Sequence, residues 1–446
     1  MSIPTTADPA PGIDSPAPAV SRRYAWTVFA LSFGLLLSDY MSRQVLNAVF
    51  PLLKAEWGLT DAKLGSLSGV VALAVALLTF PMSLLADRWG RVRSLVVAAV
   101  MWSLATLVCA VAAGYGEMFL GRLFVGIGEA AYGSIGIAVV LSVFPARLRA
   151  TLSGAFIAGG AFGSVLGVAL GGAIAQHFGW RWAFGVMAFF GLALAAAFAV
   201  VVTENRLDPR RDASDDRPEE HAKARLRSLL PQLFSSVSVV SAYVGSGLQL
   251  FIPGALLAWL PSFFNRYYHM PTAKAGVTAG LFALLIGAGM IIGGAVADRI
   301  GRTLQIRRWA TAIVCSFLSL VLLTAAFRAT TGTAQMLLLA AGALVSGATA
   351  GPAAAMVANL TPGAISSTAF GTLTLANSLL GLAPGSAVTG MVADHLGLLG
   401  ALRLVPLIAA VPALAFVVGR RYYERDITRL TALAAPAPAQ AAAATA

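Results

Sequence analysis

Long apolar runs alternate with short polar segments along most of the chain. A run of about 20 apolar residues is long enough to cross the hydrocarbon core of a bilayer as a helix. The pattern predicts twelve such helices and therefore an all-α integral membrane protein. The predicted helices cover approximately residues 25–50, 62–86, 93–113, 117–142, 150–176, 181–203, 235–265, 273–297, 307–327, 334–358, 364–392 and 400–419.

Composition and charge support this placement. Hydrophobic residues make up 58% of the chain and charged residues 11%, whereas soluble domains carry about 25% charged residues. The 31 Lys and Arg residues concentrate in every second polar segment, beginning with the one before the first span. This positive-inside bias predicts a multi-pass protein of the inner, cytoplasmic membrane with both termini in the cytoplasm. The net charge of +12 then reflects orientation and not a nucleic-acid surface.

Two polar sequences occur twice at the same spacing. Residues 85–91, Leu-Ala-Asp-Arg-Trp-Gly-Arg, return at 296–302 as Val-Ala-Asp-Arg-Ile-Gly-Arg, and residues 61–65 match 272–276 in the same way. Internal repeats of this kind build many transporter folds. We therefore predict two pseudo-symmetric six-helix halves, a polar linker between them and disordered, low-complexity tails. The boundaries are 1–21 for the N-terminal tail, 22–203 and 231–425 for the halves, 204–230 for the cytoplasmic linker and 426–446 for the C-terminal tail.

The paired motif and the twelve spans resemble the major facilitator superfamily over about residues 22–425. Within that superfamily the chain is most similar to spinster-type transporters. Residues 122–132, RLFVGIGEAAY, look like their Arg…Gly-x-Gly-Glu-Ala-Ser-Tyr run, and residues 39–43, DYMSR, are similar to their Asn-Tyr-x-Asp-Arg. Ser42 stands where the family has Asp, and Asp39 where it has Asn. The resemblance implies the major facilitator fold and alternating access of a central site.

The repeated motif is a candidate gate. A carboxylate at the inner end of a helix can pair with arginine and with a neighbouring helix N-terminus. Such a latch would hold the inner side closed until the halves rock; the alternative is that these charges only anchor loops among lipid headgroups. The gating residues are Asp87, Arg88, Arg91, Asp298, Arg299 and Arg302.

Glycines recur every four residues in the fifth span, on one helix face that another helix can approach closely. These positions are Gly159, Gly163, Gly167 and Gly171. The resemblance implies packing against span eleven of the other half. That span carries Gly381, Gly385 and Gly390. The two spans end alike at His177 and His395, which we expect at the outer membrane interface.

Four charges fall inside predicted spans: Asp39, Arg43, Arg122 and Glu129. Each costs about 2.5–3.5 kcal/mol at a span centre unless it is paired. Asp39 and Arg43 are four residues apart and so predicted to pair, while Glu129 needs a partner on another helix, for which Arg43 is the candidate. Arg122 begins span four and is expected to snorkel towards the outer surface. All four positions are uncharged in the second half.

We interpret Asp39 and Glu129 as proton acceptors and Arg43 as a binding group for an anionic substrate. The alternative is a fixed ion-pair network that joins spans one and four. The second half offers neutral hydrogen-bonding groups in place of charges, Asn359 among them. The full set of predicted substrate-binding residues is Arg43, Arg122, Tyr40, Gln249, Trp259 and Asn377.

The sequence therefore predicts a proton-coupled secondary transporter of a small organic solute, anionic or amphipathic. A sugar-acid or carboxylate symporter, an uncoupled uniporter and a non-transporting membrane sensor are the alternatives. No spacing for a nucleophile and base, a metal site or a phosphate loop indicates an enzyme, and Cys109 and Cys315 are expected to be packing residues. We expect no cofactor or metal beyond the coupling proton, no nucleic acid, and a monomer whose partners are its solute and the bilayer.

Overall fold

The structure is a computed structural model that describes residues 20–130, 132–144, 148–204, 234, 236–302, 304–361 and 366–434. Most of the predicted N-terminal tail and linker, and the chain beyond residue 434, lie outside this part. The N-terminal half comprises α1 (Arg22–Trp57), α2 (Asp61–Trp89), α3 (Arg91–Val111), α4 (Tyr115–Glu129), α5 (Tyr132–Val143), α6 (Arg149–Phe178) and α7 (Trp180–Val201). The C-terminal half comprises α10 (Val237–Tyr267), α11 (Thr272–Gly301), α12 (Arg307–Arg328), α13 (Thr333–Gly347), α14 (Ala350–Asn359), α15 (Ser366–Ala376), the π-helical η5 (Asn377–Leu382), α16 (Ala383–Leu404), the 3-10 helix η6 (Val405–Ala409) and α17 (Ala410–Ala434).

Several predicted spans are built from more than one element. Span four is α4 followed by α5, and span ten is α13 followed by α14. Span eleven runs through α15, η5 and the first part of α16. The chain then reverses at Gly397, whose φ of 71° and ψ of 161° break the helix, and this left-handed φ favours glycine because it has no Cβ. The rest of α16, η6 and α17 form span twelve.

Nine helical stretches of the described residues are long and apolar enough to cross a membrane. The last of them, residues 368–429, contains both span eleven and span twelve. Span one and span four are the predicted spans without such a stretch, and they are the spans that contain the four intramembrane charges. The charges lower the hydropathy of span one, whereas the described part of span four is divided at residue 131 into α4 and α5, each too short to cross a membrane alone.

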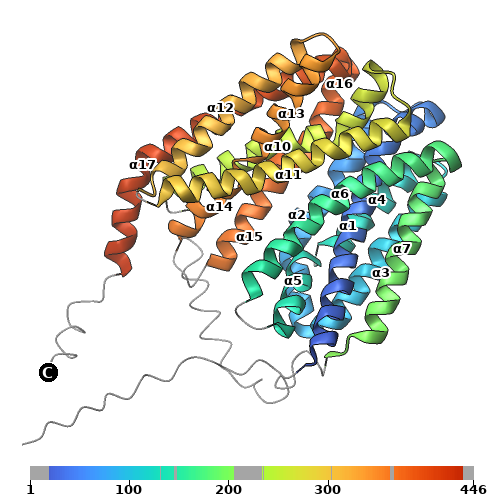
Figure 1. The fold of residues 1–446 in the computed structure, drawn as a ribbon, viewed down its shortest axis with the longest axis horizontal. Helices are drawn as coiled ribbons and strands as arrows, with labels where there is room; N and C mark the ends of the chain where they lie inside the picture. Colours follow the sequence, from blue (N-terminus) through green and yellow to red (C-terminus); the bar gives the residue numbers. More distant parts are fainter. Residues whose placement is uncertain are drawn as a thin grey trace, which may run out of the picture.

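The two halves meet at one end of the molecule and diverge towards the other (Figure 1). We call the end where α1 begins and α17 ends the inner side, and the opposite end the outer side. Across the interface α2 packs on α16 and α6 packs on α11. Glycine permits this closeness, because a Cβ built at Gly69 would lie 2.9 Å from the Ala383 carbonyl oxygen, and one at Gly276 2.6 Å from that of Val168. The outer side is closed in this conformation.

The four-residue glycine face of α6 does not contact span eleven, and that prediction is wrong. A Cβ at Gly163 would lie 2.9 Å from the Leu37 carbonyl oxygen, and one at Gly167 2.7 Å from the Met41 Cα, both on α1 of the same half. Gly159 and Gly171 also face α1. Spacing of four defines a helix face but not the helix that covers it. It is Gly172, one position around the helix, that meets α11.

The last helix continues past the predicted boundary at residue 425. It runs to Ala434, and the Asp426 carboxylate explains part of the extension. Its Oδ2 accepts hydrogen bonds from the Ser236 hydroxyl at 2.7 Å and from the Ser238 amide at 2.9 Å. These groups lie at the start of α10, where helical amides lack internal partners. Asp426 thereby holds the inner end of α17 against span seven.

Candidate functional site

Arg43 and Glu129 form an ion pair between span one and span four. The Arg43 Nη2 lies 2.7 Å and its Nε 3.1 Å from the Glu129 Oε2. The Glu129 side chain is fully buried, whereas 21% of the Arg43 side chain is exposed. The prediction that Glu129 finds its partner on another helix is confirmed. Of the two side chains, Arg43 is therefore the one with an accessible surface.

Local sequence explains why Glu129 stands at this point. It is the last residue of α4, and the Gly-Ile-Gly run before it allows α4 to sit closely between α2 and α3. A Cβ at Gly126 would lie 2.8 Å from the Val71 carbonyl oxygen, and one at Gly128 2.8 Å from the Trp102 amide nitrogen. The following helix, α5, begins at Tyr132, and the partial positive charge of its N-terminus favours a carboxylate there.

Asp39 lies beside this pair without being its partner. The residue is 4% exposed, and its Oδ1 has no hydrogen-bond partner. Asp39 is within electrostatic range of both Glu129 and Arg43. The predicted Asp39–Arg43 ion pair is nevertheless wrong, because the Arg43 Nε and Nη2 are both directed at Glu129. A spacing of four permits a pair on one helix, but here the carboxylate from the other helix occupies the guanidinium.

Tyr40 completes the cluster on α1. The Arg43 guanidinium carbon lies 5.3 Å from the centroid of the Tyr40 ring, within range of a cation–π interaction. Helix α6 also contacts the Tyr40 ring, since a Cβ at Gly160 would lie 2.9 Å from it. The ring therefore supports Arg43 in its orientation. A role in substrate binding stays a prediction.

Arg122 is fully buried and does not snorkel, so that prediction is wrong. Its Nη1 donates to the Ser42 carbonyl at 2.8 Å and its Nη2 to the Arg43 carbonyl at 3.0 Å. The guanidinium thus reaches inwards from α4 to the backbone of α1, where carbonyl oxygens replace water as acceptors. These two bonds fix the position of α1 at Arg43. A role of Arg122 in substrate binding stays a prediction.

Arg122→Lys is expected to reduce the free energy of unfolding by about 1.5–3 kcal/mol, the usual contribution of a hydrogen bond from a charged group. A lysine ammonium lacks the planar fork that reaches two successive carbonyls. Thermal unfolding of the purified protein measures the effect. Arg181→Lys is the control: Arg181 pairs with Glu56 on the surface, with 47% of its side chain exposed. Unchanged stability with weakened solute binding would instead support the substrate-binding role of Arg122.

The predicted residues of the second half are dispersed. Gln249 is fully buried, and neither side-chain polar atom has a partner. Trp259 is also fully buried; its Nε1 donates to the Ser386 carbonyl at 3.0 Å, and its ring packs on Phe50 of the other half. The Asn377 Oδ1 accepts a hydrogen bond from the Ser246 hydroxyl at 2.8 Å, at the start of η5. Among the described residues, no hydrogen bond or ion pair joins these three residues to the Arg43 cluster.

The repeated motif is described only in part. The side chains of Asp87 and Arg88 lie outside the described residues, and Arg299 and Arg302 are exposed. Asp298 pairs with Arg308 of α12 at 3.0 Å, within its own half. At the first copy, the Glu204 carboxylate accepts the amides of Arg91 and Val92 at 2.8 Å each. An inner latch between the halves stays a prediction.

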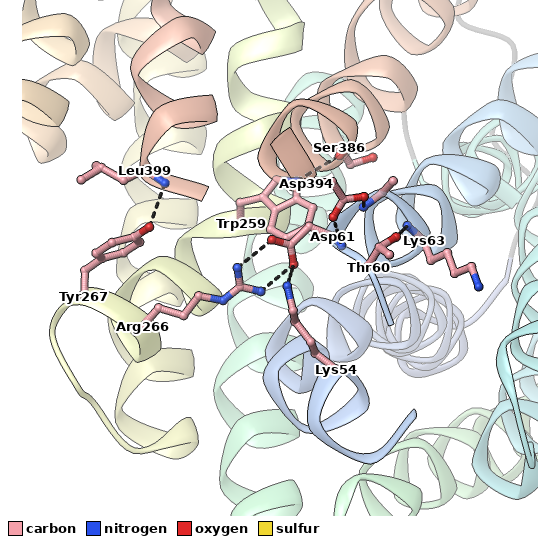
Figure 2. Close-up of polar contacts among 11 residues, drawn as sticks. Lys54, Thr60, Asp61, Lys63, Trp259, Arg266, Tyr267, Ser386, Asp394 and Leu399 are labelled. Carbon is pink, nitrogen blue, oxygen red and sulfur yellow. Dashed lines mark hydrogen bonds and ion pairs between the residues drawn. The ribbon is translucent and has the colours of Figure 1, made fainter. Parts of the chain in front are cut away.

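A polar cluster on the outer side was missed by sequence reasoning. Asp61 at the start of α2 accepts from Lys54 of α1 at 2.7 Å and, with both oxygens, from Arg266 of α10 at 2.7 and 2.8 Å. Figure 2 shows both cations pointing at Asp61, with Asp394 of α16 beside it. Arg266 and Asp394 belong to the second half. The signal was present in the repeat, since Asp61 and Asp394 both stand in segments that the two halves share.

A neighbouring pair on this side stays within the first half. Glu56 accepts from the Trp180 indole and from Arg181 at 2.8 Å. The Trp180 hydrogen bond, and then that of Arg181, hold the pKa of Glu56 below its usual range. Stability from this group is therefore present above the ordinary pKa of a glutamate and is lost as pH falls through the lowered value. The pair ties α1 to α7.

Known proteins share this architecture. A model of the Major Facilitator Superfamily matches residues 32–385. The chain is 26% identical over 276 residues to the probable 4-methylmuconolactone transporter of Cupriavidus pinatubonensis, covering 59% of this chain and 61% of that protein. It is 27% identical over 266 residues to protein spinster homolog 3 of Danio rerio, covering 59% of this chain and 51% of that protein. These matches span half to three fifths of the relatives' length.

A solved structure has the same fold. A bacterial homolog of the human lysosomal transporter spinster, in an inward-facing and unoccupied conformation, matches with a TM-score of 0.82 at 19% identity, covering 91% of this chain and 99% of that chain. Spinster proteins thus appear among both the relatives and the structures, which confirms the resemblance seen in the sequence. Because the family model takes in most of the chain and parts of both halves, the protein belongs to the Major Facilitator Superfamily of membrane transporters.

Proposed function

We propose that this transporter is proton-coupled and carries a small organic anion across the inner membrane by alternating access. The observation that carries the proposal is the buried Arg43–Glu129 pair with Asp39 beside it. Arg43 gives both described bonds to Glu129, so Asp39 has no cation of its own. A buried carboxylate without a cation of its own is costly in its charged form. Of the two carboxylates in this cluster, Asp39 is therefore the one that we expect to bind a proton at the smaller cost in free energy.

The same geometry supports an anionic solute. A carboxylate or phosphate that approaches the exposed part of Arg43 competes with Glu129 for the guanidinium. Released from Arg43, Glu129 becomes a second buried carboxylate that favours a proton. Binding of an anion and binding of a proton then assist one another, which is the linkage that symport requires. The closed outer side and diverging inner side correspond to an inward-facing state, if the basic inner segments are cytoplasmic.

The names of relatives bear on the solute without deciding it. One is called a probable transporter of 4-methylmuconolactone, an organic-acid derivative, and another is a spinster protein. Uptake into proteoliposomes under an imposed pH gradient, with a panel of small carboxylates and lysolipids, separates the two. Gradient-driven accumulation of a carboxylate supports the proposal. Transport of a neutral solute with no response to the gradient contradicts it.

Asp39→Asn is expected to abolish accumulation driven by the pH gradient while solute counterflow at equal pH continues. The amide cannot take up a proton, but it leaves the Arg43–Glu129 pair in place. Glu117→Gln is the control, since Glu117 is a carboxylate that lies near the outer surface and hydrogen-bonds the Ala113 amide at 2.8 Å. Gradient-driven accumulation by Asp39→Asn at the unmodified rate would rule out Asp39 as the coupling group.

A further inference from the structure

The outer ends of the two halves are joined by a pair of helix caps that are exchanged between them. The Asp394 Oδ1 of α16 accepts the Asp61 amide at 2.6 Å and its Oδ2 the Ala62 amide at 3.1 Å, at the start of α2. The Gln176 Oε1 of α6 accepts the Ala273 amide at 2.9 Å, at the start of α11. In both places the fifth helix of one half caps the second helix of the other.

The repeat shows that these are the same contact made twice. Residues 61–65 correspond to 272–276, so Ala62 and Ala273 are equivalent positions. Ala-Gln-His-Phe-Gly at 175–179 likewise corresponds to Ala-Asp-His-Leu-Gly at 393–397, which makes Gln176 the equivalent of Asp394. Both of these segments end in a glycine with positive φ, 90° at Gly179 and 71° at Gly397. The pseudo-two-fold axis thus relates one cap to the other.

The caps matter because the first amides of a helix have no partner inside it. A side-chain oxygen satisfies them, and the partial positive charge at this end favours an anion. At α11 the preceding residue, Pro271, provides no side-chain cap. At α2, Thr60 caps only the Lys63 amide, at 3.3 Å. The described side-chain bonds to the Asp61, Ala62 and Ala273 amides come from the opposite half, so they exist only while the outer side is closed.

The two caps are unequal. Asp394 is charged and takes two amides, whereas Gln176 is neutral and takes one. The α2 end also carries the ion pairs of Asp61 with Lys54 and Arg266 (Figure 2). Asp394 and Gln176 are both exposed, so water can replace the lost acceptors when the halves separate. Both caps can therefore break and form again, and the cap at α2 is the stronger of the two.

We propose that Asp394 and Gln176 are the outer gate of this transporter: exchanged helix caps that form as the outer side closes, with the Asp394 cap setting the balance between outer-closed and outer-open states. The two residues position helices and do not contact the solute. They control how long the outer side stays closed in each transport cycle. This role is independent of which solute is carried and of whether a proton accompanies it.

The test measures the distance between the halves directly in the full-length protein. Trp182 of α7 and Leu337 of α13 are exposed at the outer ends of their helices (60% and 66%), and each is replaced by a spin-labelled cysteine. Pulsed electron paramagnetic resonance then measures the distance between the two labels. Cys109 and Cys315 are replaced by serine in all variants. Asp394→Asn is expected to raise the ratio of outer-open to outer-closed molecules by about tenfold, because it removes the charge and one amide bond.

Gln176→Glu is the converse variant, and it is expected to lower the same ratio because it places a charged acceptor at the start of α11. Glu117→Gln is the matched control. It neutralises a carboxylate that accepts a backbone amide at an outer helix start, but within one half, so it leaves the distance distribution unchanged. An Asp394→Asn distribution equal to that of Glu117→Gln overturns the proposal, as does a shift towards the outer-closed state from relief of repulsion with Asp61. Near-isosteric amide variants keep the fold, and thermal unfolding verifies it.

Discussion

Glu129→Gln is expected to reduce gradient-driven transport by about a hundredfold or more and to destabilise the protein. Removing one partner of a buried ion pair typically costs about 3–5 kcal/mol, because the remaining charge is left uncompensated. Arg43 keeps some exposure, which favours the lower end of that range. A loss of about 3 kcal/mol corresponds to roughly a hundredfold decrease in the equilibrium population of the conformation that contains this pair. We expect gradient-driven transport to fall with that population. Proteoliposome uptake and thermal unfolding measure the two effects.

Glu56→Gln is the control for this prediction, since Glu56 also pairs with an arginine at 2.8 Å but in the open: 40% of its side chain and 47% of that of Arg181 are exposed. Exposed pairs contribute only about 0–1 kcal/mol. Equal effects of the two substitutions would mean that burial does not govern the Arg43–Glu129 pair. A Glu129→Gln variant that is unstable but still accumulates solute would support the alternative of a fixed network between spans one and four.

The charged cluster illustrates what sequence can and cannot predict. Four charges inside apolar spans identify the candidate site, because a charge in a bilayer needs a partner. Since the partner of Glu129 must lie on another helix, the sequence also predicts Arg43 as that partner. Helical spacing also allows Arg43 to pair with Asp39, and only the placement of α4 beside α1 decides between the two carboxylates. Arg122 appears superficial from its position near a helix start. Its burial depends on α1, a helix about eighty positions away in sequence.

The interfaces between helices also have one feature that the sequence predicts and one that needs the structure. The glycine spacing of α6 predicts a face that packs closely, and it does, but on α1 instead of span eleven. Periodicity belongs to one helix, whereas a packing partner is a property of two. The sequence contains the signal for the exchanged caps, since both repeated segments can be recognised in it: 61–65 with 272–276, and 175–179 with 393–397. The sequence does not show that the segment at 393–397 lies against 61–65, or that the segment at 175–179 lies against 272–276.

Gly65→Val is expected to prevent closure of the outer side and so to stop transport. Gly65 lies one turn into α2, against span eleven. A Cβ built there would collide with the Ser386 carbonyl oxygen and lie 3.2 Å from the Ala387 Cα. Backbone atoms cannot move aside as a flexible side chain does, so α2 and α16 must separate for the larger residue to fit. Because the same contact is absent in an outer-open state, the substitution disfavours one end of the cycle more than the other.

This difference gives the substitution a conformational signature in addition to a loss of activity. The Trp182–Leu337 distance should lengthen in most molecules, solute counterflow should fall to background, and thermal stability should change little because the outer-open state has no clash. Gly185→Val on α7 is the control, since a Cβ there has nothing within 4 Å; it should leave both distance and transport unchanged. A Gly65→Val protein that still closes and transports would show that the α2–α16 contact is looser than its geometry indicates. The close approach at Gly65 and the Asp394 cap at the start of α2, one turn earlier in the helix, would then not act together as one gate.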